Sequence, residues 1–115
     1  MKDLKRKIHY WCSDTMQNKI TGKGVVCAVL DTGITQHPDL VGRIVGWKDC
    51  VQGKKTIYDD NGHGTHVAGI LAGNGKSGRG LYSGMAPEAQ IFAVKVLNQR
   101  GCNTLKSLLY DDKLM

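Results

Sequence analysis

Two short segments of this chain carry side chains whose types suit proton-transfer chemistry. Asp31 directly follows the apolar run Val25–Leu30, and His63 lies between two glycines, Gly62 and Gly64. A carboxylate that orients an imidazole, while the imidazole accepts a proton from a nucleophile, is the working arrangement of many hydrolases. The flanking glycines leave space for another chain to approach the ring. The two segments therefore predict two thirds of a nucleophilic hydrolase site.

Two other interpretations stay open from these residues alone. An aspartate at the end of a strand is also a common turn residue, because its carboxylate accepts hydrogen bonds from nearby amides. His63 and His66 lie on one face of a predicted helix and could bind a metal ion together. The glutamate of an H-E-x-x-H zinc motif is absent between them, and no third ligand is evident.

The order of the apolar segments predicts the elements that position Asp31 and His63. We expect a helix over 3–18, a strand over 25–30, a weaker strand over 43–49, a helix from 63 or 64 to about 73, a strand over 91–97 and a last helix from about 104. Strands that alternate with helices favour an α/β fold around a parallel sheet, and the continuous apolar run at 25–30 suits a strand covered on both faces. Functional groups of such sheets lie beyond the carboxyl ends of the strands, where Asp31 stands.

The composition limits the classes of partner. The 115 residues suffice for one small domain, and the net charge is +6. Much of this positive charge lies at the start of the chain, in Lys2, Lys5, Arg6 and Lys7. No basic face continues along the sequence, so we expect neither nucleic acid nor a membrane surface as a partner.

Export and cysteine chemistry follow from the same composition. No apolar run approaches the roughly 20 residues that a membrane-spanning helix needs. The basic start is not followed by the apolar stretch of a secretory signal, so we expect a cytoplasmic chain with reduced thiols. The four cysteines, Cys12, Cys27, Cys50 and Cys102, form no C-x-x-C pair and no zinc pattern. Cys27 lies within an apolar strand and is predicted to be a small buried hydrophobic residue.

Several segments together resemble one protein family. They are Val29–Ile34 around Asp31, His37–Leu40, His63–Gly69, Gly84–Pro87 and Ala93–Leu97. On these segments, and over residues 20–105 as a whole, the chain resembles the subtilisin-like serine proteases, the subtilases of peptidase family S8. The spacing between the aspartate motif and the histidine motif is also typical of that family.

The resemblance implies a fold and two catalytic roles. The fold would be a partial subtilisin-like three-layer α/β fold with a parallel sheet, from which the C-terminal part is missing. Residues 1–115 would be the N-terminal portion of one peptidase domain, with a helical lead-in over about 3–18 and a motif-bearing core over about 20–105. Asp31 would accept a hydrogen bond from Nδ1–H of His63, whose Nε2 would take the proton of an attacking serine. His66 would lie one turn deeper, as a packing residue.

The resemblance also implies a polypeptide substrate, which subtilases bind as an added β-strand. Gly101, Cys102 and Asn103 fall where the receiving edge strand lies, although family members often show Gly-Ser-Gly there. Asp39 matches an aspartate with which some members bind calcium, so calcium is one possible ligand. The Gly-rich loop 73–83 resembles the version that supplies no obvious ligands, and no other metal or cofactor is expected. The oligomeric state is left open.

The nucleophile is the point at which the resemblance breaks. The family's serine lies in a Gly-Thr-Ser-Met-Ala segment far beyond the histidine, and none of Ser13, Ser77, Ser83 and Ser107 has that context. The asparagine that helps to bind the oxyanion is also expected downstream. We therefore expect serine endopeptidase function by family and an inactive, marginally stable chain in isolation. The alternative is a non-catalytic, degenerate subtilase module that binds peptide or a complementary chain.

Overall fold

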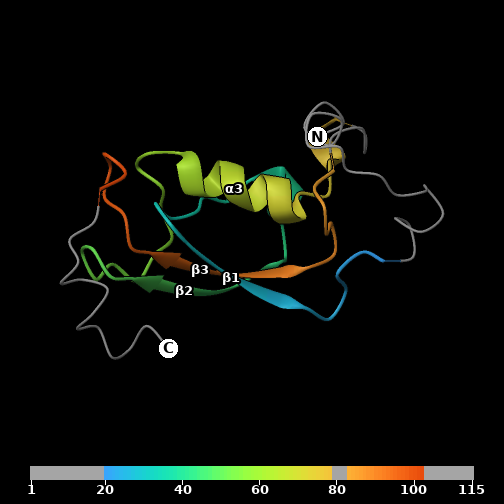
Figure 1. Cartoon of the computed structure of the whole chain (residues 1–115), viewed down its shortest axis with the longest axis horizontal. Coiled ribbons are helices and arrows are strands. Elements are labelled where there is room, and N and C mark those ends of the chain that lie inside the picture. Colours follow the sequence, from blue (N-terminus) through green and yellow to red (C-terminus); the bar gives the residue numbers. More distant parts are fainter. Residues whose placement is uncertain (1–19, 79–82, 103–115) are drawn as a thin grey trace.

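The described residues form a small parallel sheet with one α-helix packed against it (Figure 1). The computed structural model describes residues 20–78 and 83–102, so the helices expected over 3–18 and from about 104 lie outside the described residues. The strands are β1 (Val26–Asp31), β2 (Ile44–Asp49) and β3 (Gln90–Lys95), and the helix is α3 (His63–Ala72). Two short 3-10 helices lie between these elements: η1 (Pro38–Leu40) follows β1, and η2 (Lys76–Gly78) follows α3. Each expected strand and the central helix are confirmed.

The last of the described strands, β3, lies in the middle of the sheet. The spatial order is β1-β3-β2, and β3 is parallel to both neighbours. The register pairs Asp31 with Lys95 and Asp49 with Lys95, so the carboxyl ends of all three strands meet at one edge. This edge is where parallel α/β sheets present their functional groups.

Small side chains allow α3 to pack closely on one side of the sheet. Ala68 and Ala72 are fully buried against a core that includes Ile34, Ile91 and Ala93. Because alanine adds little width, the helix axis can approach the strands without leaving voids. Figure 1 shows α3 lying along one side of β1 and β3.

The opposite side of the sheet differs from the expectation. Val26 and Leu30 of β1 are 52% and 48% exposed, Val45 of β2 is 49% exposed and Phe92 of β3 is 37% exposed. The prediction that the first strand is covered on both faces is therefore wrong for the described chain. Cys27 is half-buried rather than buried. We call Val26, Leu30, Val45 and Phe92 the open face.

The end of α3 is closed by one of the segments that carry the family resemblance. The amides of Gly84, Met85 and Ala86 donate to the carbonyls of Gly73, Ile70 and Leu71 at 2.6, 2.9 and 2.7 Å. Helix ends leave several carbonyls without partners inside the helix, and these three bonds satisfy them. The segment that begins at Gly84 therefore holds the helix in place from its C-terminal end.

Candidate active site

Asp31 and His63 meet at the carboxyl edge of the sheet. Nδ1 of His63 lies 2.9 Å from Oδ1 and 3.0 Å from Oδ2 of Asp31. The amide of Thr32 donates to the same Oδ1 of Asp31 at 2.7 Å. The carboxylate thus has fixed partners on two sides. We call these two side chains the Asp31–His63 pair.

The two side chains of the pair differ in their exposure to solvent. The side chain of Asp31 is 12% exposed, whereas that of His63 is 63% exposed. Among residues 20–78 and 83–102, Nε2 of His63 has no hydrogen-bond partner. With the neutral ring protonated on Nδ1 and bonded to Asp31, Nε2 carries a free lone pair that faces outward. This arrangement can accept a proton from a group that approaches from outside the described residues.

The glycines of the two motifs are explained by contact between the motifs. A Cβ at Gly64 would lie 2.2 Å from the carbonyl oxygen of Gly33, and a Cβ at Gly33 would lie 2.1 Å from the carbonyl oxygen of Tyr58. Gly33 also has a φ of 122°, a region that favours glycine. The start of α3 therefore approaches the turn after β1 backbone to backbone. The sequence predicts that Gly62 and Gly64 both leave space for another chain. Gly33 fills the space beside Gly64, whereas a Cβ at Gly62 would meet nothing within 4 Å.

Side chains from three places satisfy the first amides of α3. The amide of His63 donates to Oδ1 of Asn61 at 3.1 Å, and the amide of Gly64 donates to Oγ1 of Thr32 at 2.8 Å. The amide of Thr65 donates to Oδ2 of Asp59 at 2.8 Å. Since the first-turn amides of a helix have no partners within the helix, these bonds fix both the starting residue and the direction of α3.

Asp59 is the residue that the sequence analysis missed. Its carboxylate also accepts from the amide of Gly62 at 2.7 Å and from the hydroxyls of Thr32 and Thr65 at 2.8 and 2.6 Å. Burial disfavours the charged form, but the hydrogen bonds from Thr65, Gly62 and Thr32 outweigh it and lower the pKa of Asp59 to about 2. An aspartate shortly before a predicted helix start is a capping signal that could have indicated this role.

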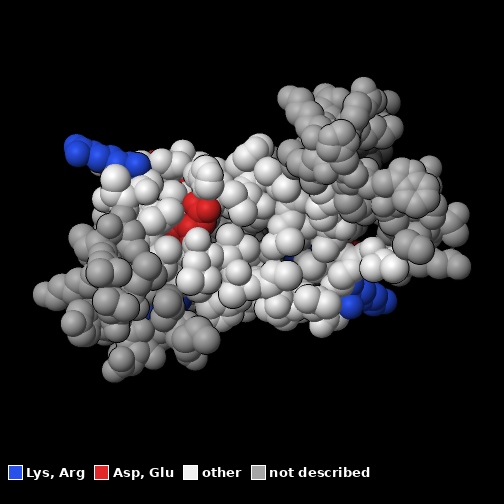
Figure 2. Space-filling view, viewed as in Figure 1, with Lys and Arg blue, Asp and Glu red and all other residues white. Residues whose placement is uncertain are grey.

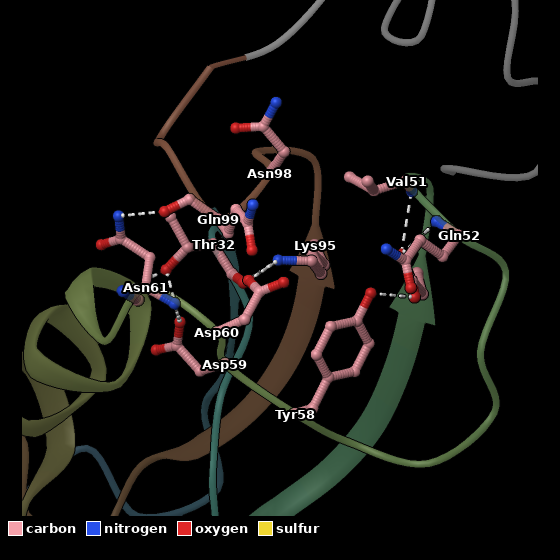
Figure 3. Close-up of polar contacts among 12 residues, drawn as sticks. Thr32, Val51, Gln52, Tyr58, Asp59, Asp60, Asn61, Lys95, Asn98 and Gln99 are labelled. Atoms are coloured by element: carbon pink, nitrogen blue, oxygen red, sulfur yellow. Dashed lines mark hydrogen bonds and ion pairs between the residues drawn. The ribbon is translucent and has the colours of Figure 1, made fainter.

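A buried lysine supports the same edge of the sheet. Lys95 is fully buried, and its Nζ donates to the carbonyl of Thr32 at 2.5 Å and to Oδ1 of Asp60 at 2.8 Å. Its ammonium group also lies 4.9 Å from the centre of the Tyr58 ring. Figure 3 shows the carboxylate of Asp60 and the end of the Lys95 side chain pointing toward each other between β3 and the loop before α3. A buried ammonium is tolerated only with such partners.

Tyr58 connects this lysine to the end of β2. Its hydroxyl donates to Oδ2 of Asp49 at 2.7 Å, and the amides of Val51, Gln52 and Lys54 donate to the same carboxylate. Burial and the hydrogen bond to Asp49 raise the pKa of Tyr58, because both disfavour the phenolate. The same set of donors, against an opposing effect of burial, lowers the pKa of Asp49. The loop after β2 is thus fixed to the edge of the sheet.

Two of the predicted substrate residues, Gly101 and Cys102, lie in a turn next to the loop that precedes His63. Gly101 and Cys102 are exposed and belong to a turn rather than to a strand, and Asn103 lies outside the described residues. Oδ1 of Asn98 accepts from the amide of Cys102 at 3.0 Å, which closes the turn. The amide group of Asn61 donates to the carbonyl of Gln99 at 2.9 Å, so the turn is tied to the residues before α3. A substrate role for Gly101, Cys102 and Asn103 stays a prediction.

The other histidine of α3 does not lie where it was expected. His66 is exposed, so the prediction that it packs one turn deeper is wrong. It lines a cavity of about 480 Å³ together with Thr35, His37 and Asp39. In the described part of the chain, no three His, Cys, Asp or Glu side chains are grouped as metal ligands.

Asp39 uses its carboxylate to hold the loop after α3. Its Oδ1 accepts from the amide of Ser77 at 2.9 Å, and its carbonyl accepts from the amide of Asn74 at 3.0 Å. Burial opposes ionisation, but the hydrogen bonds from Ser77 and the nearby charges of His37 and Arg43 lower the pKa of Asp39. The carboxylate of Asp39 is thus bonded to an N–H group of this loop. Calcium binding by Asp39 stays a prediction.

The other charged side chains and the thiols of the described residues are distributed over several parts of the structure. On the face shown in Figure 2, the lysine and arginine side chains of the described residues lie mostly near two opposite ends, with acidic side chains between them. Cys27 and Cys102 have free thiols, as the sequence predicts, and Cys12 lies outside the described residues. None of the helices within the described ranges is long and apolar enough to cross a lipid bilayer.

Comparisons with known proteins agree on one family. The profile described as "Subtilase family" matches residues 22–108. Serine protease AprX of Bacillus subtilis (strain 168) is 57% identical over 90 residues, which cover 78% of this chain, and minor extracellular protease Epr of the same strain is 51% identical over 90 residues. Subtilisin Savinase of Lederbergia lenta is 48% identical over 89 residues. A solved structure described as a cold-adapted subtilisin-like serine proteinase has a TM-score of 0.67 and 36% identity, over 77% of this chain and 30% of that one.

Fold and site together define an α/β protein whose parallel sheet presents a carboxylate–imidazole pair at the carboxyl ends of its strands. The chain belongs to the subtilase family. The resemblance inferred from the motifs is therefore confirmed, and so is the partial subtilisin-like fold. The chain spans 20%, 13% and 32% of the lengths of AprX, Epr and Savinase.

Proposed function

We propose that this chain supplies the aspartate and the histidine of a serine endopeptidase. The observation that carries the proposal is the Asp31–His63 pair, with Nδ1 at 2.9 Å from the carboxylate and Nε2 outward. The relatives of this chain are named serine protease, extracellular protease and subtilisin. These names support proteolysis of polypeptides as the family function.

Each member of the pair has a distinct task in this reaction. Nε2 of His63 accepts the hydroxyl proton of a serine as that oxygen bonds to the peptide carbonyl carbon. The same proton then passes from Nε2 to the leaving amine as the carbon–nitrogen bond breaks. Asp31 holds the ring with Nδ1–H toward itself and stabilises the imidazolium that exists between the two transfers. The serine is expected from a part of the protein other than residues 1–115.

The 115 residues by themselves are expected to be inactive. In this class of protease, removal of the serine alone removes nearly all of the rate enhancement over the uncatalysed reaction, because the triad acts as a unit. Purified residues 1–115 should neither hydrolyse casein nor react with a fluorophosphonate probe. Covalent labelling of any serine in this chain would contradict the proposal.

A chimera tests the pair directly. Residues 22–102 of this chain replace the matching segment of AprX, and casein hydrolysis is measured for the chimera and its variants. His63→Ala and Asp31→Asn should each lower kcat by about 10⁴-fold or more. His66→Ala is the matched control, since it removes an exposed histidine of the same helix outside the pair. An active chimera that tolerates His63→Ala would refute the role of the pair.

The open face favours a second candidate, a non-catalytic module that binds a complementary chain. Four large apolar side chains exposed on one small sheet are unusual for a polypeptide that acts alone. The coding DNA beyond Met115 separates the two candidates. A Gly-Thr-Ser-Met-Ala segment in any frame would support a protease, and its absence would support the module.

A further inference from the structure

One carboxylate contacts both segments that carry the Asp31–His63 pair. Oδ1 of Asp59 accepts from the hydroxyl of Thr32, the residue after Asp31, at 2.8 Å. Oδ2 of Asp59 accepts from the amide and the hydroxyl of Thr65, two residues after His63, at 2.8 and 2.6 Å. Within the described residues, the hydrogen bonds of Asp59 go to Thr32, Asn61, Gly62 and Thr65 and not to the side chain of Asp31 or His63.

Thr32 completes a closed circuit of bonds around the pair. Its amide donates to Oδ1 of Asp31 at 2.7 Å, and its hydroxyl oxygen accepts from the amide of Gly64 at 2.8 Å. Gly64 is the residue after His63, and Nδ1 of His63 is hydrogen-bonded to Oδ1 of Asp31 at 2.9 Å. These bonds form a closed ring of contacts through Thr32, Gly64, His63 and Asp31. Thr32 is 1% exposed, so water does not compete for these bonds. The relative position of the imidazole and the carboxylate is therefore set through Thr32.

Asp59 determines which way the hydroxyl of Thr32 points. A hydroxyl has one proton, and here that proton is donated to Asp59, which leaves a lone pair for the amide of Gly64. Without an acceptor at position 59 the proton can turn toward Gly64, where it opposes an N–H group. The direction of the hydroxyl proton of Thr32 thus decides whether the hydrogen bond from the amide of Gly64 to Thr32 can form.

We propose that Asp59 is a positioning residue for the Asp31–His63 pair and acts through the hydroxyl of Thr32 and the first turn of α3. The catalytic importance of Asp59 rests on the proposed function of the pair, whereas the hydrogen bonds that position the pair do not depend on that function. This positioning role differs from helix capping alone, because a cap would stabilise α3 without affecting which nitrogen of His63 carries the proton.

The amide variant Asp59→Asn is a sharp test because its shape is nearly unchanged. Both oxygens of Asp59 accept hydrogen bonds only, from the amides of Asn61, Gly62 and Thr65 and from two hydroxyls. An asparagine replaces one of these oxygens by an NH₂ group, which then faces N–H donors. Whichever way the amide is turned, some of the hydrogen bonds that one of the two oxygens of Asp59 accepts are lost.

The readout is the tautomer of His63 in the full 115-residue chain. With ¹⁵N-labelled histidine, long-range ¹H–¹⁵N correlation spectra distinguish a ring protonated on Nδ1 from one protonated on Nε2, the form that a free histidine prefers. In the native chain we expect His63 mainly in the Nδ1–H form. In Asp59→Asn and Thr32→Val we expect at least a severalfold shift toward the Nε2–H form, while Thr32→Ser keeps the native form.

The matched control is Thr35→Val, which removes a hydroxyl from an exposed neighbour that also faces Thr65, at 3.5 Å, and leaves the circuit intact. This control should keep the native tautomer. If Asp59→Asn and Thr32→Val also keep the native tautomer, the inference is overturned. Dispersed methyl signals of the buried Ile34 and Ile91 identify the folded population on which the tautomer is measured.

The chimera with AprX provides the second measurement, in a framework that does not depend on the stability of the isolated chain. Asp59→Asn should lower kcat by about tenfold to a hundredfold, as expected for a slightly misplaced catalytic group, with KM changed less than about twofold. An unchanged kcat would also overturn the inference. If the chimera with native Asp59 is inactive, the proposed function fails, whereas the tautomer measurement still decides the positioning role.

Discussion

Asp59 illustrates how a single carboxylate can link the stability of the fold to the geometry of the site. It holds the start of α3 with a negative charge at the end where the helix dipole is positive. Its pKa of about 2 in the folded chain lies below the value of about 3.9 for an unfolded aspartate. The charged form is thus stabilised by folding.

The first prediction concerns acid stability. Because the folded pKa of Asp59 is lowered, its contribution is fully present above about pH 4 and is lost as the pH falls toward about 2. Thermal unfolding between about pH 6 and pH 2 should show a loss of Tm on the acid side that is smaller in Asp59→Asn than in the native chain. Asp39 and Asp49, whose pKa values are also lowered, titrate in both proteins and cancel in the comparison. Equal acid-side slopes for the two proteins would contradict this prediction.

The second prediction concerns the ammonium group of Lys95. Asp60→Ala leaves this fully buried charge without the carboxylate that it contacts, and should destabilise the chain by about 3 kcal/mol. The double variant Asp60→Ala with Lys95→Met removes the charge as well and should recover part of that loss, since an apolar side chain of similar length can fill the site. Urea unfolding of the native chain, both single variants and the double variant provides the complete cycle. Additive effects would show that the two charges do not interact.

At this scale the sequence predicted the residues of the pair but not those that hold them. Asp31 and His63 stand in local motifs whose combination and spacing resemble one family, so the sequence indicated both residues although each motif alone left other interpretations open. A capping signal could have indicated the bonds from Asp59 to the start of α3. The contacts of Asp59 and Lys95 with Thr32 join residues far apart in the chain, and no periodicity or composition relates residues at such separations. His66 was misplaced because its exposure depends on the rotation of α3, which the first-turn bonds set.

Helix α3 and the turn after strand β1 meet at a contact between two glycines, and this contact gives the third prediction. Gly64→Ala places a Cβ 2.2 Å from the carbonyl oxygen of Gly33, so the helix start must move away from the turn. We expect a loss of stability of about 1–3 kcal/mol, as for other overpacked sites. Chemical denaturation monitored by circular dichroism measures it.

The same helix provides the control for this change. A Cβ at Gly69 meets nothing within 4 Å, so Gly69→Ala should be neutral or should stabilise the chain by about 0.5–1 kcal/mol through helix propensity. If both variants are destabilised equally, the contact with Gly33 does not explain the loss of stability at position 64.

The elements themselves were largely predictable from sequence. The strand expected at 25–30 is β1 at Val26–Asp31, and the helix expected from 63 or 64 to about 73 is α3 at His63–Ala72. Apolar runs and glycine breaks are local signals, which explains this agreement. The coverage of β1 was predicted wrongly, because an apolar run shows that a strand can be buried and not what is present to bury it.

The molecule as a whole has a core on one side of its sheet and the open face on the other. Exposed apolar surface of this kind promotes association. The fourth prediction is that the isolated chain self-associates and that Leu30→Lys reduces this association. Light scattering and size-exclusion chromatography over a range of concentrations measure the effect. Val41→Lys is the control, because Val41 is 66% exposed but lies outside the strands, and an equal effect of both variants would indicate net charge as the cause.

The bonds around the pair have a consequence for the order of events during protein synthesis. Every side chain that we find holding Asp31 and His63 lies at or before Lys95 in the chain. On a translating ribosome, the proposed acid–base pair can therefore assemble once the chain up to Lys95 has emerged. For the proteolytic function that we propose, with its serine expected elsewhere in the protein, this order would let the acid–base pair form independently of the nucleophile.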